Sequence, residues 1–278
     1  MKKSIFFLAS IGAAVFGLAS CSSGCGSGAE AFETDSVRWA DSLVMDGCRA
    51  KVDIKGFYPT NAKTALADSV RAWIVERLEN GVYGNSGFRV SVSSIEDGKK
   101  VVEECGNTIM DFVKTDFDGF VADSIAVQYE FDFSFGQEFR SDSLLSYVFT
   151  DYVYLGGAHG GSLGVGQTFN VNSGERLTNA NIFEPDKVEA VIELVKDGLW
   201  NQYFKENADE GSTLGDMLII NPDTLALPAF PPMFDDKGLV FTYQQYEIAS
   251  YADGMPSCTL SYDRLKPLMR PETARLLP

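Results

Sequence analysis

The chain has 278 residues, of which 45% are apolar, and 39 acidic against 23 basic side chains give it a net charge of −16. This composition, with 20 Phe and 11 Tyr, excludes a disordered chain and allows one large domain or two small ones. The acidic balance argues against nonspecific nucleic-acid binding, and a single His excludes any mechanism or metal cage that needs two. We expect neither a cofactor nor a metal site.

The first residues have the pattern of an export signal. Lys2 and Lys3 precede an apolar run over residues 5–18, which is too short to cross about 30 Å of hydrocarbon. The Leu-Ala-Ser-Cys sequence that ends at Cys21 resembles the processing box of bacterial lipoproteins. Such a box implies cleavage before the Cys and attachment of a diacylglyceryl group to its sulfur. The alternative is an ordinary signal peptide that happens to end beside a Cys.

We favour the lipoprotein interpretation, with a signal peptide at 1–20 and a lipidated Cys21 that begins a flexible tether over 21–40. Several acyl chains on one residue make a lasting anchor, because the burial of each methylene group adds to the others. Ser22 favours the outer membrane under the best-known sorting rule. We therefore expect a cell-envelope protein, anchored in the outer membrane and facing the periplasm or the surface.

Four further cysteines follow Cys21, namely Cys25, Cys48, Cys105 and Cys258. An exported protein can keep disulfides, and four cysteines allow three complete pairings. Cys48–Cys105 is the strongest candidate for a bridge. However, Cys105 falls on the apolar face of a helix and Cys258 alternates with apolar strand residues, so we favour buried thiols.

The first half of the folded part has clear periodic patterns. Alternation over residues 50–54 is typical of a half-buried strand. Helical spacing over 66–78 ends at Asn80-Gly81, and a second helical pattern covers 101–113. The strongest alternation predicts a strand over 125–135, which pairs antiparallel with a strand over 144–155.

The second half predicts shorter elements. They are a strand and hairpin around Asn172-Ser173-Gly174, a helix opened by Pro185, strands over 239–243 and 257–262, and a short closing helix. The whole pattern predicts an α+β fold with helices packed on mainly antiparallel sheets. We expect two intimately packed lobes, a first module over 41–165 and a second over 166–278.

A glycine-rich stretch over 156–164 contains the only His. Its last five residues fit the G-x-S-x-G motif of serine hydrolases, but a strand pattern follows Ser162 and His159 precedes it, so the match is accidental. One interpretation of His159 is a lone acid/base or a metal ligand. We favour a structural or binding role, in which the ring nitrogens bond to backbone groups of a tight turn.

A cluster of tyrosines, Tyr243, Tyr246 and Tyr251, follows one of the predicted strands. Such side chains stack on sugar rings or anchor protein partners, and packing in the core is the commoner alternative. No spacing singles out a catalytic pair among the 39 acidic residues.

Two stretches are similar to a known pair of modules. The first is Tyr154-x-Gly156-Gly157-Ala158-His159-Gly160, followed by Phe169, Gly174, Leu177-Thr178 and Ile182-Phe183. The second is Phe241-x-Tyr243-x-x-Tyr246-Glu247-Ile248-Ala249-x-Tyr251-Ala252-x-Gly254. Over about residues 45–270, the chain resembles the paired extracytoplasmic domains of unknown function 4163 and 3298. These stretches contain our five candidate ligand-binding residues: Tyr154, His159, Tyr243, Tyr246 and Tyr251.

The resemblance implies an α+β pair of modules outside the cytoplasm. In the family, the pair forms the outer part of a membrane-anchored anti-sigma factor that senses lysozyme, and it also accompanies the catalytic domain of a peptidoglycan deacetylase. This sequence contains neither a transmembrane helix with a sigma-binding tail nor the Asp/His metal ligands of a deacetylase. We therefore expect neither intracellular signalling nor deacetylation.

Three classes of function follow from these observations. We favour a lipid-anchored, non-catalytic binding protein of the cell envelope that recognises peptidoglycan glycan or a cationic protein such as lysozyme. Loss of Lys2 and Lys3 with the signal leaves a net charge near −18, which would attract such a cationic partner. The alternatives are an envelope glycan- or peptide-processing enzyme that uses His159, and a structural or assembly lipoprotein.

Overall fold

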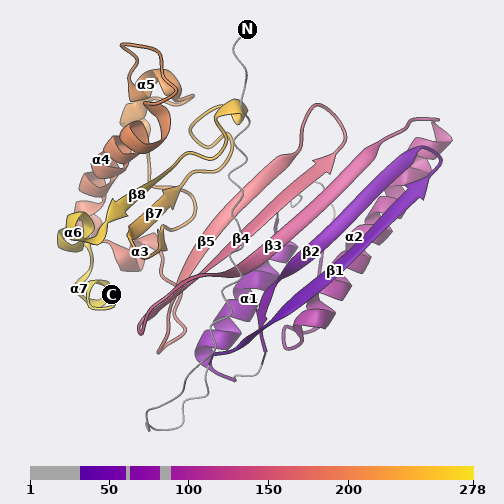
Figure 1. Cartoon of the computed structure of the whole chain (residues 1–278), viewed down its shortest axis with the longest axis horizontal. Helices are drawn as coiled ribbons and strands as arrows, with labels where there is room; N and C mark the ends of the chain where they lie inside the picture. Colours follow the sequence, from indigo (N-terminus) through magenta and orange to yellow (C-terminus); the bar gives the residue numbers. More distant parts are fainter. Residues whose placement is uncertain (1–31, 61–62, 82–88) are drawn as a thin grey trace. The chain divides into compact units, whose positions relative to one another are not determined.

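The structure, a computed structural model, describes residues 32–60, 63–81 and 89–278. The expected signal peptide, the lipidation site Cys21 and Cys25 lie outside the described residues, so these assignments stay predictions. The described part has the predicted α+β fold, with a five-stranded sheet, a three-stranded sheet and helices packed on them (Figure 1). Among these residues, no helix combines the length and the apolar character that a membrane span requires.

The larger sheet has the strand order β1-β2-β3-β4-β5. Its strands are Thr34–Met45, Cys48–Pro59, Gln128–Arg140, Leu144–Leu155 and Gly161–Asn170. All neighbours pair antiparallel except β2 and β3, which run parallel. A parallel pair needs a crossover connection, and the segment that contains α1 (Ala65–Glu79) and α2 (Gly98–Ala122) supplies it.

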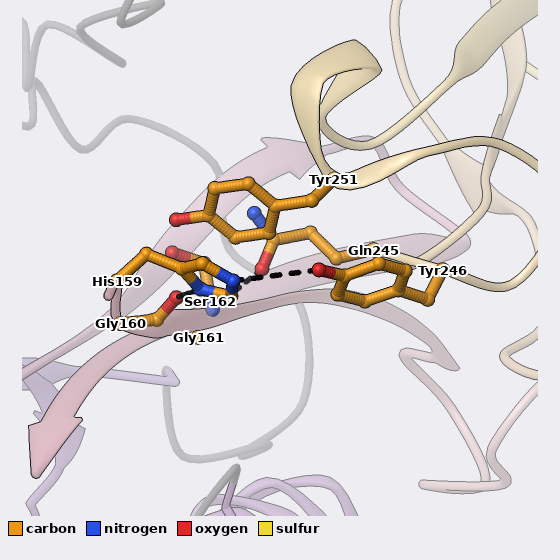
Figure 2. A pocket seen from close by; sticks show the side chains of 7 residues that line it. All are labelled: His159, Gly160, Gly161, Ser162, Gln245, Tyr246 and Tyr251. Carbon is orange, nitrogen blue, oxygen red and sulfur yellow. Dashed lines mark hydrogen bonds between the residues drawn. The ribbon is translucent and has the colours of Figure 1, made fainter. Parts of the chain in front are cut away.

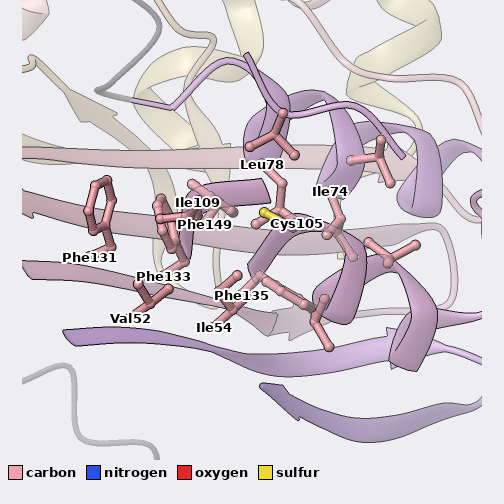
Figure 3. Packing of buried hydrophobic residues seen from close by; sticks show 14 of the residues in the cluster. Val52, Ile54, Ile74, Leu78, Cys105, Ile109, Phe131, Phe133, Phe135 and Phe149 are labelled. Atoms are coloured by element: carbon pink, nitrogen blue, oxygen red, sulfur yellow. The ribbon is translucent and has the colours of Figure 1, made fainter. Parts of the chain in front are cut away.

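One face of this sheet forms the main core with α1 and α2. Figure 3 shows its buried side chains, which include Val52, Ile54, Ile74, Leu78, Cys105, Ile109, Phe131, Phe133, Phe135 and Phe149. The predicted alternation is confirmed by the three buried Phe side chains of β3. The strand begins at Gln128, however, and Ile125 lies before it with 47% of its surface exposed.

The opposite face of the sheet carries polar and charged side chains, and we call it the polar face. Arg38 of β1 donates two hydrogen bonds to Asp53 of β2, at 3.0 and 3.1 Å. Lys55 of β2 lies 2.9 Å from Asp132 of β3. Burial alone would raise the pKa of Asp53, but the hydrogen bonds and charges of Arg38 and Lys55 outweigh it. The pKa of Asp53 therefore lies below its ordinary value.

The rest of the chain surrounds the smaller antiparallel sheet, which consists of β6 (Met233–Phe234), β7 (Gly238–Thr242) and β8 (Ser257–Ser261). The helix predicted after Pro185 is α4 (Val188–Leu199), which packs on β8 and continues into a π-helical turn at Trp200–Phe204. The shorter helices are α3 (Asn179–Ile182), α5 (Leu214–Met217), α6 (Tyr262–Leu265) and α7 (Pro271–Ala274).

Two expected boundaries are wrong. Residues 34–40, which we assigned to the tether, belong to β1, where Val37 is buried. The expected boundary at 165/166 falls inside β5, and that strand pairs with β4 along its whole length. The glycines of β5 suggested a connection, but a Cβ at Gly166 would lie only 2.6 Å from the side chain of Met233. Gly166 is therefore a strand residue that allows β6 of the smaller sheet to approach β5.

The preference for buried thiols is confirmed for Cys105 and Cys258. Cys48, Cys105 and Cys258 are free and buried, so the candidate bridge Cys48–Cys105 is not formed. Burial raises the pKa of Cys105 and of Cys258 to about 12. These thiols are therefore unreactive residues of the two cores.

Candidate functional site

A pocket of about 240 Å³ lies between the β4–β5 connection and the segment that links β7 to β8 (Figure 2). It is lined by His159, Gly160, Gly161, Ser162, Gln245, Tyr246 and Tyr251. The fold thus brings together the two stretches that carry the family resemblance, although they lie far apart in the sequence.

Two glutamine side chains join these stretches. Gln244 accepts a hydrogen bond from the N–H of Gly164 at 3.0 Å and donates one to its carbonyl oxygen at 2.8 Å. Gln245 accepts from the N–H of Ser162 at 2.9 Å through its side-chain oxygen. Side-chain amides therefore take the place of a neighbouring strand along this part of the β5 edge. The amide nitrogen of Gln245 remains a potential donor to a ligand.

The imidazole of His159 is oriented by three contacts. Its Nδ1 lies 2.9 Å from the carbonyl oxygen of Gly160, and because a carbonyl oxygen only accepts, we assign the proton to Nδ1. The ring stacks on Tyr251, with centroids 3.9 Å apart and an angle of 24°. Nε2 lies 3.4 Å from the hydroxyl of Tyr246 and can accept from it.

Tyr246 combines exposure with an unusual backbone conformation. Its surface is 55% exposed and its φ is +65°. The left-handed region costs a residue with a Cβ roughly 1–2 kcal/mol. Burial of the side chain does not offset this cost, since more than half of its surface meets solvent. Strain of this kind is typical of functional sites, where it holds a side chain in a required position.

Tyr251 is held by a rigid turn. It begins the 3₁₀ turn Tyr251–Asp253, which is closed by a capping box between Ser250 and Asp253. Tyr203, from the π-helical turn after α4, donates a hydrogen bond of 2.5 Å to the backbone oxygen of Asp253. The stacked pair of Tyr251 and His159 is therefore fixed in position by the fold itself.

Three of the five predicted residues, His159, Tyr246 and Tyr251, line the pocket. Tyr154 lies outside the lining, with its hydroxyl bonded to the oxygen of Gly157 at 3.0 Å. The prediction for Tyr243 is wrong, because its side chain is only 1% exposed and donates to the oxygen of Ala226 within the smaller core.

Sequence reasoning missed two lining side chains, that of Ser162, which it weighed only as part of an accidental hydrolase motif, and that of Gln245. No spacing or motif singles Gln245 out. Its place between the stretches depends on the tertiary contact with Ser162, which only the folded chain reveals.

The pocket offers flat rings, hydroxyl groups and an amide. Within the described ranges, no group of three or more His, Cys, Asp or Glu side chains is placed to hold a metal ion. A strand follows Ser162, whereas the hydrolase motif requires a helix. Stacking surfaces beside a few polar groups are the usual features of a reversible binding site.

Comparison with known proteins finds a family match in the C-terminal part of the chain and similar folds over most of its length. Residues 180–263 match a family described as a protein of unknown function, DUF3298. A crystal structure of a DUF3298 family member from Bacteroides fragilis is similar over 88% of this chain and 97% of its own, with a TM-score of 0.70 and 20% identity. A family member from Pseudomonas aeruginosa covers the same shares, with a TM-score of 0.53 and 16% identity. No curated protein matches the chain.

These findings support the 3298-like part of the resemblance. At such identities, the similarity to the solved structures establishes the fold alone, and it extends beyond the matched family region. The 4163-like assignment of residues 41–165 stays a prediction.

Proposed function

We propose that this chain is a lipid-anchored, non-catalytic binding protein of the bacterial cell envelope, and that the pocket around His159, Tyr246 and Tyr251 binds peptidoglycan glycan. The observation that carries this proposal is the exposed ring of Tyr246, held at a positive φ opposite the stacked pair of Tyr251 and His159. An exposed aromatic ring held at such a backbone cost is what a ligand-binding position requires.

The chemistry of the pocket suits a sugar ring. A pyranose presents C–H groups on its face and hydroxyl groups around its edge. The rings of Tyr246 and Tyr251, with centroids 5.8 Å apart at an angle of 32°, supply apolar surface for the face. The amide of Gln245 and the hydroxyl of Ser162 supply hydrogen bonds for the edge.

The connectivity of the larger sheet also supports an anchored receptor. The chain enters β1 at Thr34, and β1 ends at Met45 beside the start of β2. β4 ends, and β5 begins, at that same end of the sheet. The pocket therefore lies one full strand away from the entry of the tether, which for the 12 residues of β1 is about 40 Å.

Sedimentation with purified peptidoglycan sacculi tests the proposal. The full chain is purified from membranes in detergent, and Tyr246→Ala and Tyr251→Ala are each expected to reduce co-sedimentation about tenfold. Ile219→Ala is the matched control, because Ile219 is an apolar residue with 56% exposure outside the pocket lining. Folded tyrosine variants that sediment like the wild type would refute the proposed site. Release of soluble glycan fragments by the wild type would refute its non-catalytic character.

A cationic protein such as lysozyme is the second candidate ligand, favoured by the net charge of −16. Binding that depends on this charge should weaken steeply as the salt concentration rises through about 0.1 M, because ions screen exposed charges. Binding through ring stacking and hydrogen bonds to sugar hydroxyls should depend little on salt. A titration in low and in high salt therefore separates the two ligands.

A further inference from the structure

The pocket borders the polar face of the larger sheet, because Ser162 of β5 lines it and stands opposite Tyr152 of β4. Its floor includes Gly160, and a Cβ at this position would lie 2.5 Å from the ring of Tyr152. The glycine therefore allows the ring of Tyr152 to pack directly against the pocket loop. A ligand in the pocket thus has Tyr152 as its neighbour on the side of the sheet.

The strand register places residues of β4 next to residues of β3 on the polar face, in two neighbouring cross-strand pairs. Tyr152 pairs with Asp132 of β3, and Tyr154 pairs with Glu130. The two tyrosines are separated by one residue and point to the same face, about 7 Å apart along β4. Both are partly exposed. The register thus places two further aromatic side chains next to the pocket, on the polar face.

The charged side chains of the polar face form ion pairs with one another. Glu130 lies 3.9 Å from Lys51, Asp132 lies 2.9 Å from Lys55, and Asp53 binds Arg38. A charged ligand would have to replace these pairs. A neutral ligand with many hydroxyl or amide groups can instead donate to the free lone pairs of the carboxylates without breaking a pair.

We propose that the ligand is a linear oligosaccharide of several uncharged sugar rings, which runs from the His159 pocket over Tyr152 and Tyr154 and onto the polar face. This inference rests on the proposed glycan-binding function and adds the length and the direction of the ligand. Tyr152 and Tyr154 stack on successive rings, and Glu130 and Asp132 accept hydrogen bonds from them.

Titration calorimetry with N-acetylglucosamine oligomers tests the inference. The wild-type chain in detergent is expected to bind the hexamer about tenfold more tightly than the dimer, because only the hexamer reaches the added aromatic surfaces. Tyr154→Ala should reduce the affinity for the hexamer severalfold and leave the dimer unaffected. Tyr154→Phe is the matched control. It keeps the ring, loses the bond to Gly157, and should bind the hexamer like the wild type.

The outcomes separate the two proposals. The extended site is overturned if the wild type binds dimer and hexamer with equal affinity. It is also overturned if Tyr154→Ala binds the hexamer as tightly as the wild type does. In both cases the pocket itself stands. Because Tyr152 packs against Gly160, Tyr152→Ala should weaken both oligomers. If neither oligomer binds to the wild type, the glycan-binding function fails, and the extended site fails with it.

Discussion

At the scale of the residue, Tyr246 has a backbone that glycine would adopt without strain. We expect Tyr246→Gly to leave the free energy of unfolding unchanged or to raise it by up to about 1 kcal/mol. The variant relieves the positive φ but also gains entropy in the unfolded state. Binding to sacculi should fall about tenfold, as for Tyr246→Ala, because the exposed ring is removed. Urea unfolding and co-sedimentation measure the two effects separately.

Ser124→Gly is the matched control for this prediction. Ser124 also has a positive φ, of 58°, but it lies between α2 and β3 and outside the pocket lining. It should show a similar change in stability and keep full binding. A loss of more than about 1 kcal/mol in Tyr246→Gly alone would mean that its ring stabilises the fold. The interpretation of the strain as functional would then be wrong.

A second residue with a testable energetic role is Asp53 on the polar face. Its pKa is lowered in the folded state, because the hydrogen bonds and charges of Arg38 and Lys55 outweigh the effect of burial. A lowered pKa means that the carboxylate stabilises the fold above its unfolded pKa of about 3.9 and that this contribution disappears as the pH falls further. The effect should be modest, since both basic partners are exposed to solvent.

We therefore expect Asp53→Asn to lower the free energy of unfolding by about 1–2 kcal/mol at pH 7. The difference from the wild type should shrink as the pH falls below about 4. Chemical denaturation at a series of pH values provides the measurement. Asp209→Asn, at an exposed loop position, should match the wild type at every pH. A difference for Asp53→Asn that stays constant down to pH 2 would contradict the assigned ion pairs.

At the scale of the element, the contact between β1 and α2 depends on a glycine. A Cβ at Gly106 in α2 would lie 2.1 Å from the ring of Trp39 in β1. Gly106→Ala should therefore cost about 1–3 kcal/mol, because the ring has to move out of the helix groove. Gly119 lies in the same helix with nothing within 4 Å of an added Cβ. Gly119→Ala should be neutral or stabilise the protein by up to about 1 kcal/mol.

Thermal unfolding measures both variants, and tryptophan fluorescence reports on the environment of Trp39. If Gly106→Ala matched the stability of Gly119→Ala, the close packing of β1 on the helix would be disproved. This contact also explains why the strand β1 was not predicted. Residues 34–40 contain only a few apolar side chains between polar ones, and their partner lies in a helix far along the chain. Longer periodic runs, such as α1, α2 and β4, were predicted because each run contains its own pattern.

In the candidate site, too, local sequence patterns predicted some residues, whereas residues placed by tertiary contacts were missed. Tyr243 continues the inward alternation of Leu239 and Phe241, so a stricter use of the two-residue period would have placed it in the core. Tyr246 lies beyond the end of β7, where no period applies. The aromatic and glycine-rich stretches marked the region of the pocket. The contributions of Gln245 and Tyr152 arise from strand register and loop contacts that join distant parts of the sequence.

At the scale of the whole molecule, the two sheets are joined by a buried polar cluster. Phe234 of β6 donates its N–H to the hydroxyl of Thr168 at 3.0 Å, and its oxygen accepts from Ser146 at 2.7 Å. The hydroxyls of Ser146 and Thr168 lie 2.8 Å apart, and both residues are fully buried. Because the strand β6 of the smaller sheet completes hydrogen bonds of β4 and β5, we expect the two sheets to unfold in one transition.

Thr168→Val tests this coupling, since it keeps the shape of the side chain and removes the hydroxyl. The N–H of Phe234 would stay buried without an acceptor, which should lower the free energy of unfolding by about 1–3 kcal/mol. Thr150→Val is the control, because Thr150 bonds Ser134 within one sheet at a partly exposed position and should cost less. For each protein, the urea unfolding curve recorded by far-UV circular dichroism should coincide with the curve recorded by near-UV circular dichroism. This holds for the wild type and for both variants. Two separated transitions in the wild type would show instead that each sheet folds independently and that β6 only docks them.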